Sequence, residues 1–266
     1  MRNVRLGITI VALSLVALLI LDFVPGTWIS DESFVDGIIS YVVLGSIFYK
    51  SVHVLAFKSL QYFRLPRLHL KTVLALTLAS MFAIRQIANS DNVALQPWVA
   101  TRGIVFLFAI GFGEEMVSRA FTFGALQKFG QGRAIVISSF LFGLMHLNLY
   151  LGSNWDLWVA YGHVMSAFGF GIFICSLMIV TRSIWVAVLF HALFDWGVVF
   201  DKASSHANNG LKWNPGFWKG ISSPLIDLAI MIVVSLLLLW LNSGSIPAWL
   251  HRLAVRWKLV EVELCA

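Results

Sequence analysis

The chain has 266 residues, of which 59% are hydrophobic, 14% aromatic and only 12% charged. An average soluble domain carries about 25% charged residues, so this composition excludes an ordinary soluble domain. The Gly and Pro contents (20 and 6) exclude a collagen-like or disordered chain, and two cysteines exclude a disulfide-stapled domain. The net charge of +6 is spread over several short loops, which argues against a nucleic-acid partner.

Apolar runs long enough to cross a membrane recur along the chain. A hydrocarbon core of about 30 Å requires roughly 20 helical residues. Candidate helices lie at 6–24, 35–57, 72–87, 103–126, 134–151, 157–180, 184–200 and 225–241. The first run is too long for a signal peptide and has no cleavage site after it, so we interpret it as an uncleaved helix. The sequence predicts an all-α, polytopic membrane bundle of about eight transmembrane helices, in a single membrane-embedded domain over residues 1–266.

Lys and Arg predict the orientation of this bundle, because cytoplasmic loops are richer in them. Thirteen of the 19 fall on one side: Arg2, Arg5, Lys50, Lys58, Arg64, Arg67, Lys71, Lys128, Arg133, Arg182, Arg252, Arg256 and Lys258. Both termini are therefore predicted to be cytoplasmic. Within this side, the basic and aromatic segment 54–70 fits either a helix lying in the membrane interface or an ordinary loop.

Ionisable side chains inside the predicted helices concentrate in three of them. The fourth run carries Glu114, Glu115 and Arg119, the fifth carries His146, and the seventh carries His191 and Asp195. A charged side chain near the middle of a span costs roughly 2.5 to 3.5 kcal/mol, so such residues mark function or a specific pairing. We expect His163, in the sixth run, to form a hydrogen bond between helices instead.

Helical spacing indicates which of these side chains can meet. Glu115 and Arg119 are four residues apart with the acid first, the favourable order for an ion pair, whether structural or part of a site. Glu114 is rotated from Glu115 by about 100° and is expected to face a cavity. His191 and Asp195 are also four apart, so Asp195 can orient the imidazole, or both can face one ligand.

The depths of three residues suggest one common site. Counted from the predicted cytoplasmic ends, Glu114 and His146 lie about 18 Å into the membrane and His191 about 12 Å. Two imidazoles and a carboxylate in a water-poor cavity can deprotonate and position a water, directly or through a metal. Glu114, His146 and His191 are candidate zinc ligands, but the usual zinc helix with Glu between two His is absent, which favours metal-independent activation.

Three motifs together resemble the CPBP (CAAX protease and bacteriocin-processing, or Abi) family of intramembrane proteases. That family, which includes the type II CAAX prenyl endopeptidases, shows Glu-Glu-x-x-x-Arg, then Phe-x-x-x-His, then His-x-x-x-Asn or Asp. The chain matches these in order with Glu114-Glu115 and Arg119, with Phe142 and His146, and with His191 and Asp195. The resemblance covers residues 102–200 and implies a multi-pass protein of a bacterial-type inner membrane.

The resemblance also implies an activity and the residues that perform it. It predicts an endopeptidase acting on a membrane-anchored or lipid-modified protein or peptide, in which Glu114 and His146 activate a water. His191 and Asp195 would stabilise the oxyanion, while Glu115 and Arg119 would hold their helix in place. Asp195 stands where the prenyl-protease branch usually has Asn. An ionised Asp would repel an oxyanion, so Asp195 is expected to orient His191 or to be protonated, which argues against prenylated CAAX substrates.

Two other functions need similar residues. A non-catalytic, immunity-like scaffold would bind a peptide in the same cavity without cutting it. A proton-coupled transporter would also need buried acids and histidines, but the sequence shows no repeated half and no interrupted pair of helices. Replacement of Glu114 by Gln separates the first alternative from a protease, because it removes the base and keeps the shape of the side chain.

Overall fold

The computed structural model describes residue 16 and residues 31–89, 96–147, 157–200 and 217–243. Over these ranges the chain forms helices and short connections and no β-strand, which confirms the predicted all-α class. The predicted first helix at 6–24, residue 16 apart, and most of the segment between the predicted helices 184–200 and 225–241 lie outside the described residues.

Four long helices dominate the bundle: α2 (Asp31–Val54), α3 (Leu70–Asn89), α7 (Leu157–Thr181) and α11 (Phe217–Ser243). The shorter ones are α4 (Pro97–Glu115), α6 (Gln131–Met145), α8 (Ile184–Phe194) and α9 (Trp196–Phe200). Short helical turns complete the fold: η1 (Lys58–Tyr62), η2 (Met116–Phe123), α5 (Gly124–Leu126) and η3 (Gln127–Phe129).

The predicted count of about eight transmembrane helices is not confirmed. Four described helices are long and apolar enough to cross a membrane, at Val35–Val54, Leu70–Ala88, Leu157–Thr181 and Ile221–Asn242. The apolar helices α6 and α8 have only 15 and 11 residues, so they reach about 22 and 16 Å at 1.5 Å per residue. The helices that carry the motifs are thus among the short ones. The four long apolar helices identify the chain as an integral membrane protein.

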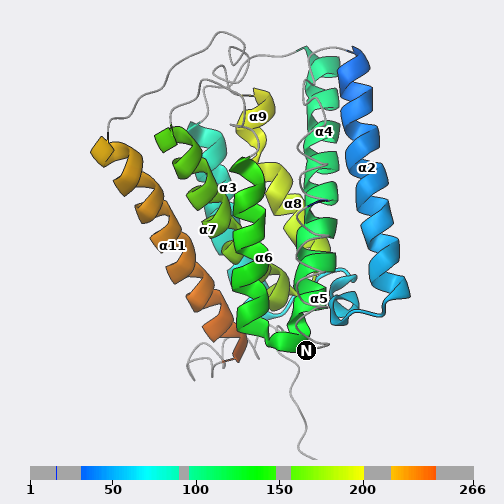
Figure 1. Cartoon of the computed structure of the whole chain (residues 1–266), viewed down its shortest axis with the longest axis vertical. Helices are drawn as coiled ribbons and strands as arrows, with labels where there is room; N and C mark the ends of the chain where they lie inside the picture. The colour runs from blue at the N-terminus through cyan, green and yellow to red at the C-terminus, as the bar shows by residue number, and fades with distance from the viewer. Residues whose placement is uncertain (1–15, 17–30, 90–95, 148–156, 201–216, 244–266) are drawn as a thin grey trace, which may run out of the picture.

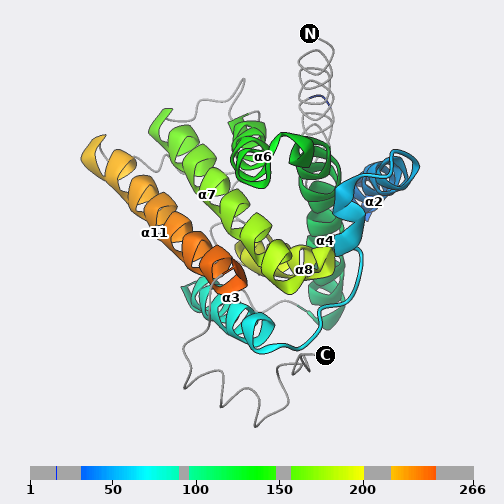
Figure 2. The same ribbon diagram turned by 90° about the horizontal axis from the view of Figure 1, so that it is seen from below.

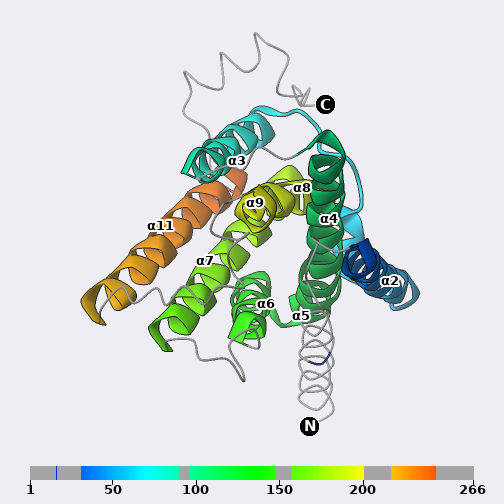
Figure 3. The ribbon, with the colours of Figure 1, turned by 90° about the horizontal axis from the view of Figure 1, so that it is seen from above.

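Of the helices that carry the motifs, α8 lies inside the bundle, whereas α6 lies at its front (Figure 1). Viewed from either end, α8 lies between α3, α7 and α4, while α2 covers the outer side of α4 and α11 that of α7 (Figures 2 and 3). This placement explains how polar side chains on α4 and α8 avoid lipid.

Close approaches between backbones set the distances between the motif helices. A Cβ added to Gly111 on α4 would lie 2.8 Å from the carbonyl oxygen of Val188 on α8. A Cβ added to Gly143 on α6 would lie 2.8 Å from the carbonyl oxygen of Val164 on α7. Small residues of this kind allow membrane helices to pack backbone against backbone, and here they bring α4 to α8 and α6 to α7.

The chain from α4 to α6 changes helix type where the motif begins. Directly after Glu115, the backbone widens into the π-helix η2, which contains Arg119 and is wholly buried. Such π segments occur mostly as single turns and often at functional sites. The turn into α6 runs through Gly130, whose φ of 106° is a conformation that residues with a Cβ rarely adopt.

One end of the bundle is closed by the connection between α2 and α3. At this end, which we call the η1 end, helices α2, α7 and α11 finish and α3, α6 and α8 begin (lower end in Figure 1). The buried Ser59 hydroxyl donates to the carbonyl oxygen of Ala120 at 2.6 Å. Tyr62 is also buried, which raises the pKa of its phenol. The segment 54–70 is therefore a loop with one short 3-10 turn, as the second of the two interpretations predicted.

Candidate active site

His191, on α8, connects the acidic residues of two motifs. Its Nδ1 lies 2.7 Å from Glu115 Oε1, so the ring N–H donates to the carboxylate. Its Nε2 lies 3.3 Å from Asp195 Oδ2 and 3.6 Å from Glu114 Oε2. The predicted contact between His191 and Asp195 is confirmed. One imidazole thus contacts three carboxylates, two of them on a neighbouring helix.

The predicted ion pair between Glu115 and Arg119 is also present. Arg119 Nε lies 3.2 Å from Glu115 Oε2, and neither side chain is exposed. Glu115 therefore bridges Arg119 and His191, one partner on each carboxylate oxygen. Helical spacing indicated only the partner on the same helix, because the contact to His191 depends on how α4 packs on α8.

Phe142, the first residue of the second motif, lies among the polar groups. The Arg119 guanidinium carbon is 4.4 Å from the centre of its ring, a cation–π contact. The ring centres of His146 and His191 lie 4.9 and 5.7 Å from it. Phe142 is fully buried and separates the two histidines. The second motif begins with this Phe, but only the tertiary structure shows that its ring lies between the two histidines.

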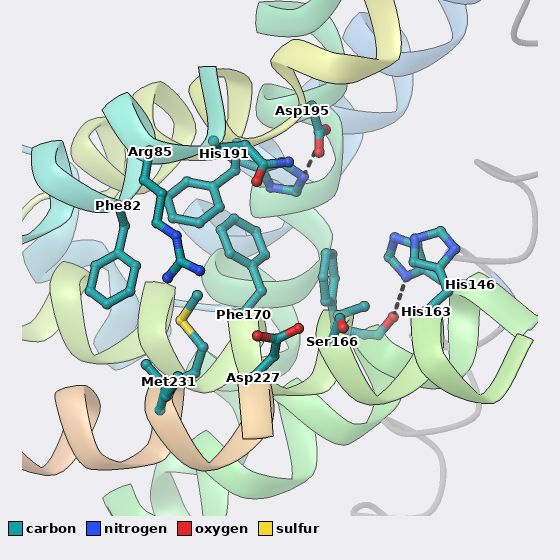
Figure 4. Close-up of a pocket in the computed structure, with 15 residues that line it drawn as sticks. Phe82, Arg85, His146, His163, Ser166, Phe170, His191, Asp195, Asp227 and Met231 are labelled. Atoms are coloured by element: carbon teal, nitrogen blue, oxygen red, sulfur yellow. Dashed lines mark hydrogen bonds and ion pairs between the residues drawn. The ribbon is translucent and has the colours of Figure 1, made fainter. Parts of the chain in front are cut away.

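His146 lies immediately after α6, on the other side of Phe142. Its Nδ1 is 2.9 Å from the carbonyl oxygen of Phe142, so the ring N–H donates to the backbone and Nε2 is left for another partner. The ring centre of His163, on α7, is 4.7 Å away. His163 was predicted to be only a link between helices, and the structure places it beside a motif residue in the same pocket (Figure 4).

The two motif histidines line one pocket of about 430 Å³. Asp195 also lines it, with a side chain 28% exposed. Its far wall, on α3 and α11, carries Arg85 and Asp227 among apolar side chains such as Met231 (Figure 4). Arg85 and Asp227 were not among the predicted site residues, because the packing of α3 and α11 against the site leaves no local signal in the sequence.

The Glu114 side chain does not lie where the sequence predicted. It was expected to face the cavity, but it is not among the residues that line the pocket. Its side chain is 8% exposed and its carboxylate contacts His191. Both glutamates of the motif therefore lie next to His191, and a ligand in the pocket would meet His191, Asp195 and His146 first.

The arrangement does not fit the three-ligand zinc centre that the sequence left open. Among the described residues, no group of three or more His, Cys, Asp or Glu side chains is arranged to hold a metal ion. Glu114 does not line the pocket, and the Phe142 ring lies between His146 and His191, so the three predicted ligands do not converge on one point.

The fold and the site define a helical membrane protein in which buried Glu, His and Arg side chains and a partly exposed Asp lie together beside a pocket. Residues 96–197, from the start of α4 to α9, match the family described as type II CAAX prenyl endopeptidase Rce1-like. The resemblance to the CPBP family is thereby confirmed, over the region that contains all three motifs. No curated protein matches the chain.

Proposed function

We propose that the chain is an intramembrane endopeptidase that hydrolyses a peptide bond with a water activated by Glu and His side chains. The observation that carries the proposal is the position of His191, held by Glu115 on one nitrogen and presenting the other to a pocket shared with His146 and Asp195. The family match supports a peptidase. The water mechanism and the substrate are our inference.

In this mechanism Glu114 acts as the base. A water bound beside His146 and His191 loses a proton to the Glu114 carboxylate, and its oxygen attacks the carbonyl carbon of the scissile bond. The tetrahedral intermediate then collapses: the C–N bond breaks, and the proton held by Glu114 passes to the leaving amine. The products are a new carboxyl end and a new amino end. Glu114 Oε2 lies 3.6 Å from His191 Nε2, so Glu114 acts on a water that is bound at this nitrogen.

His191 and Asp195 act on the oxyanion in this proposal. A His191 ring with a proton on each nitrogen donates to Glu115 through Nδ1 and to the oxyanion through Nε2. The three surrounding carboxylates compensate for its charge. Asp195, 3.3 Å from the same nitrogen, orients the ring. Glu115 and Arg119 are positioning residues, since they act on the substrate only through His191.

A survey of peptide ends in membrane fractions tests the proposal without a known substrate. Cells lacking the protein are complemented with the wild type, Glu114→Gln or Asp36→Asn at equal abundance. Asp36 is an exposed acid on α2, away from the pocket, and serves as the matched control. New N- and C-termini should appear with the wild type and Asp36→Asn and be absent with Glu114→Gln.

The same survey distinguishes the competing scaffold function. If the wild type and Glu114→Gln yield the same termini and both rescue any phenotype, the chain acts by binding, and the protease proposal is wrong. The pocket would then hold a peptide that is not cut.

A further inference from the structure

The far wall of the pocket carries two side chains of opposite charge. Arg85 lies on α3 and Asp227 on α11, and both line the pocket. They lie within Leu70–Ala88 and Ile221–Asn242, two of the stretches that are long and apolar enough to cross a membrane. Neither residue belongs to a motif, and the proposed mechanism uses neither.

These two charges have no partner in the described part of the chain. Neither side chain forms a hydrogen bond or an ion pair with a described residue, and the two do not pair with each other. Glu115, Arg119 and His191, by contrast, are joined by ion pairs. A charged side chain in a membrane-spanning helix is costly, and it is retained where it pairs with another group or lines a substrate path. A molecule in the pocket is therefore the expected partner.

The Arg85 side chain is placed to bind an acidic group. Its guanidinium is directed into the pocket, among Phe82, Phe170 and Met231 (Figure 4). A guanidinium binds a carboxylate through two parallel hydrogen bonds, and apolar neighbours strengthen such a pair because they lower the local dielectric constant. Among the described residues that line the pocket, Arg85 is the only Lys or Arg.

The other carboxylates of the pocket restrict where an acidic group can bind. Asp195 lies beside His191, and Asp227 lines the pocket from α11. Both repel a further negative charge, since like charges placed side by side are unfavourable. A peptide in the pocket can therefore place an acidic group only on the α3 side, at Arg85.

From this arrangement we propose that Arg85 is a specificity-determining residue that binds a carboxylate of the substrate. The inference rests on the proposed protease function and adds a substrate class to it. The substrate carries an acidic side chain, or its own C-terminal carboxylate, close to the bond that is cut. Asp227 does not bind this group, and it disfavours acidic groups on the α11 side.

Binding of synthetic peptides to the purified protein in detergent tests the proposal. The probes are short, fluorescent, apolar peptides with the same sequence except at one position and at the C-terminus. One carries Glu and a C-terminal amide, one Gln and an amide, and one Gln and a free carboxylate. Every protein carries Glu114→Gln, which should prevent cleavage of the probes, and fluorescence anisotropy measures the affinities.

This Glu114→Gln parent should bind at least one acidic probe about tenfold more tightly than the neutral probe. The acidic probe that is preferred identifies the source of the carboxylate. Arg85→Gln should remove the preference, and Arg85→Lys should retain it in part because it keeps the charge. Arg64→Gln is the matched control, since Arg64 is exposed and does not line the pocket. Equal affinities of the parent for all probes, absence of binding included, would overturn the proposal, as would a preference that survives Arg85→Gln.

A double variant distinguishes a direct contact from the net charge of the pocket. Arg85→Gln removes one positive charge and Asp227→Asn removes one negative charge, so the two changes together restore the net charge of the parent. The double variant should still lack the preference, whereas Asp227→Asn alone should keep it. Recovery of the preference in the double variant would show that Arg85 acts through net charge, and the proposed contact would be wrong.

These measurements do not depend on proteolysis, so the two proposals can fail separately. If the acidic preference depends on Arg85 but no new termini appear in the peptide survey, the recognition stands and the protease function is wrong. If new termini appear and the residues next to the cut are the same with the wild type and Arg85→Gln, the protease function stands and the inferred specificity is wrong.

Discussion

His191 has a different neighbour on each of its ring nitrogens. The buried Glu115 carboxylate accepts from Nδ1 and holds the ring plane, while Nε2 is directed toward Asp195 and Glu114. Arg119 in turn holds Glu115, and its guanidinium lies on the face of Phe142. The orientation of the ring thus depends on residues that a substrate in the pocket would not touch.

Glu114→Gln should lower the cleavage rate by about 10²- to 10⁴-fold, the usual contribution of a general base. The amide keeps the size of the side chain but cannot accept the proton of the attacking water. The rate is measured on a substrate identified by the peptide survey, with binding followed in parallel. Full activity of this variant would show that Glu114 is not the base.

Asp195→Asn should retain cleavage, whereas Asp195→Leu should lose it. Asn can still hydrogen-bond to Nε2 of His191, now 3.3 Å from an Asp195 oxygen, and can also donate to an oxyanion. Leu removes both interactions at similar volume. Equal activity of the two variants would mean that Asp195 does not orient His191.

Arg119→Met should lower the free energy of unfolding by about 3 to 5 kcal/mol, because it leaves the buried Glu115 with one partner fewer. The double variant Arg119→Met, Glu115→Gln should be less destabilised than the sum of the single changes, since it removes both charges. Thermal unfolding in detergent measures both. Strict additivity would indicate that the ion pair is energetically unimportant.

At the scale of elements, the contact between α6 and α7 positions His146. The Gly143 Cα faces the backbone of Val164, one residue after His163, and the last turn of α6 ends at His146. His146 and His163, two of the three histidines that line the pocket, therefore depend on a helix contact that leaves no room for a side chain.

Gly143→Leu should destabilise the protein by about 1 to 3 kcal/mol and weaken cleavage, because the new side chain must push α7 away from α6. Gly132→Ala is the matched control, since a Cβ there would meet no atom within 4 Å. It lies in the first turn of α6 and should leave both stability and cleavage nearly unchanged. A change in the control as large as in Gly143→Leu would argue against helix separation as the cause.

At the scale of the whole molecule, charge and packing divide the bundle into two unlike ends. The η1 end is basic and filled, whereas the pocket lies toward the opposite end. Charges on exposed loops contribute little to folding in such a protein. Their effect is on the direction in which the helices insert.

Neutralising Lys58, Arg64 and Arg67 together with Gln should raise the fraction of molecules inserted the wrong way round. All three are exposed residues of the α2–α3 connection. The fraction is measured in spheroplasts by labelling Arg133→Cys, at the start of α6, with a membrane-impermeant maleimide in proteins that also carry Cys265→Ser. Neutralising Arg85 alone should not produce this effect, and an unchanged orientation in the triple variant would show that these charges do not direct insertion.

Much of this architecture follows from local chemistry. Apolar composition and run length determined a helical membrane protein, because unpaired backbone groups are too costly in lipid. The spacing of Glu115 and Arg119, and of His191 and Asp195, determined two contacts, because a rise of 1.5 Å and a turn of about 100° per residue place positions four apart on one face. The motifs themselves named the six candidate site residues, whose roles stay predictions.

Contacts between helices were decided only by the tertiary structure. The faces on which α4 and α8 meet determine the hydrogen bond between His191 and Glu115 and the location of Glu114 beside the imidazole ring. The packing of α6 and α7 determines that Phe142 lies between the histidines and that His163 lies in the pocket. The packing of α3 and α11 brings Arg85 and Asp227 to the same pocket. In apolar helices nearly every face can be buried, so their sequences do not single out one partner. Close backbone contacts at residues such as Gly111 and Gly143 select it, and they act across distances in the chain that no local pattern records.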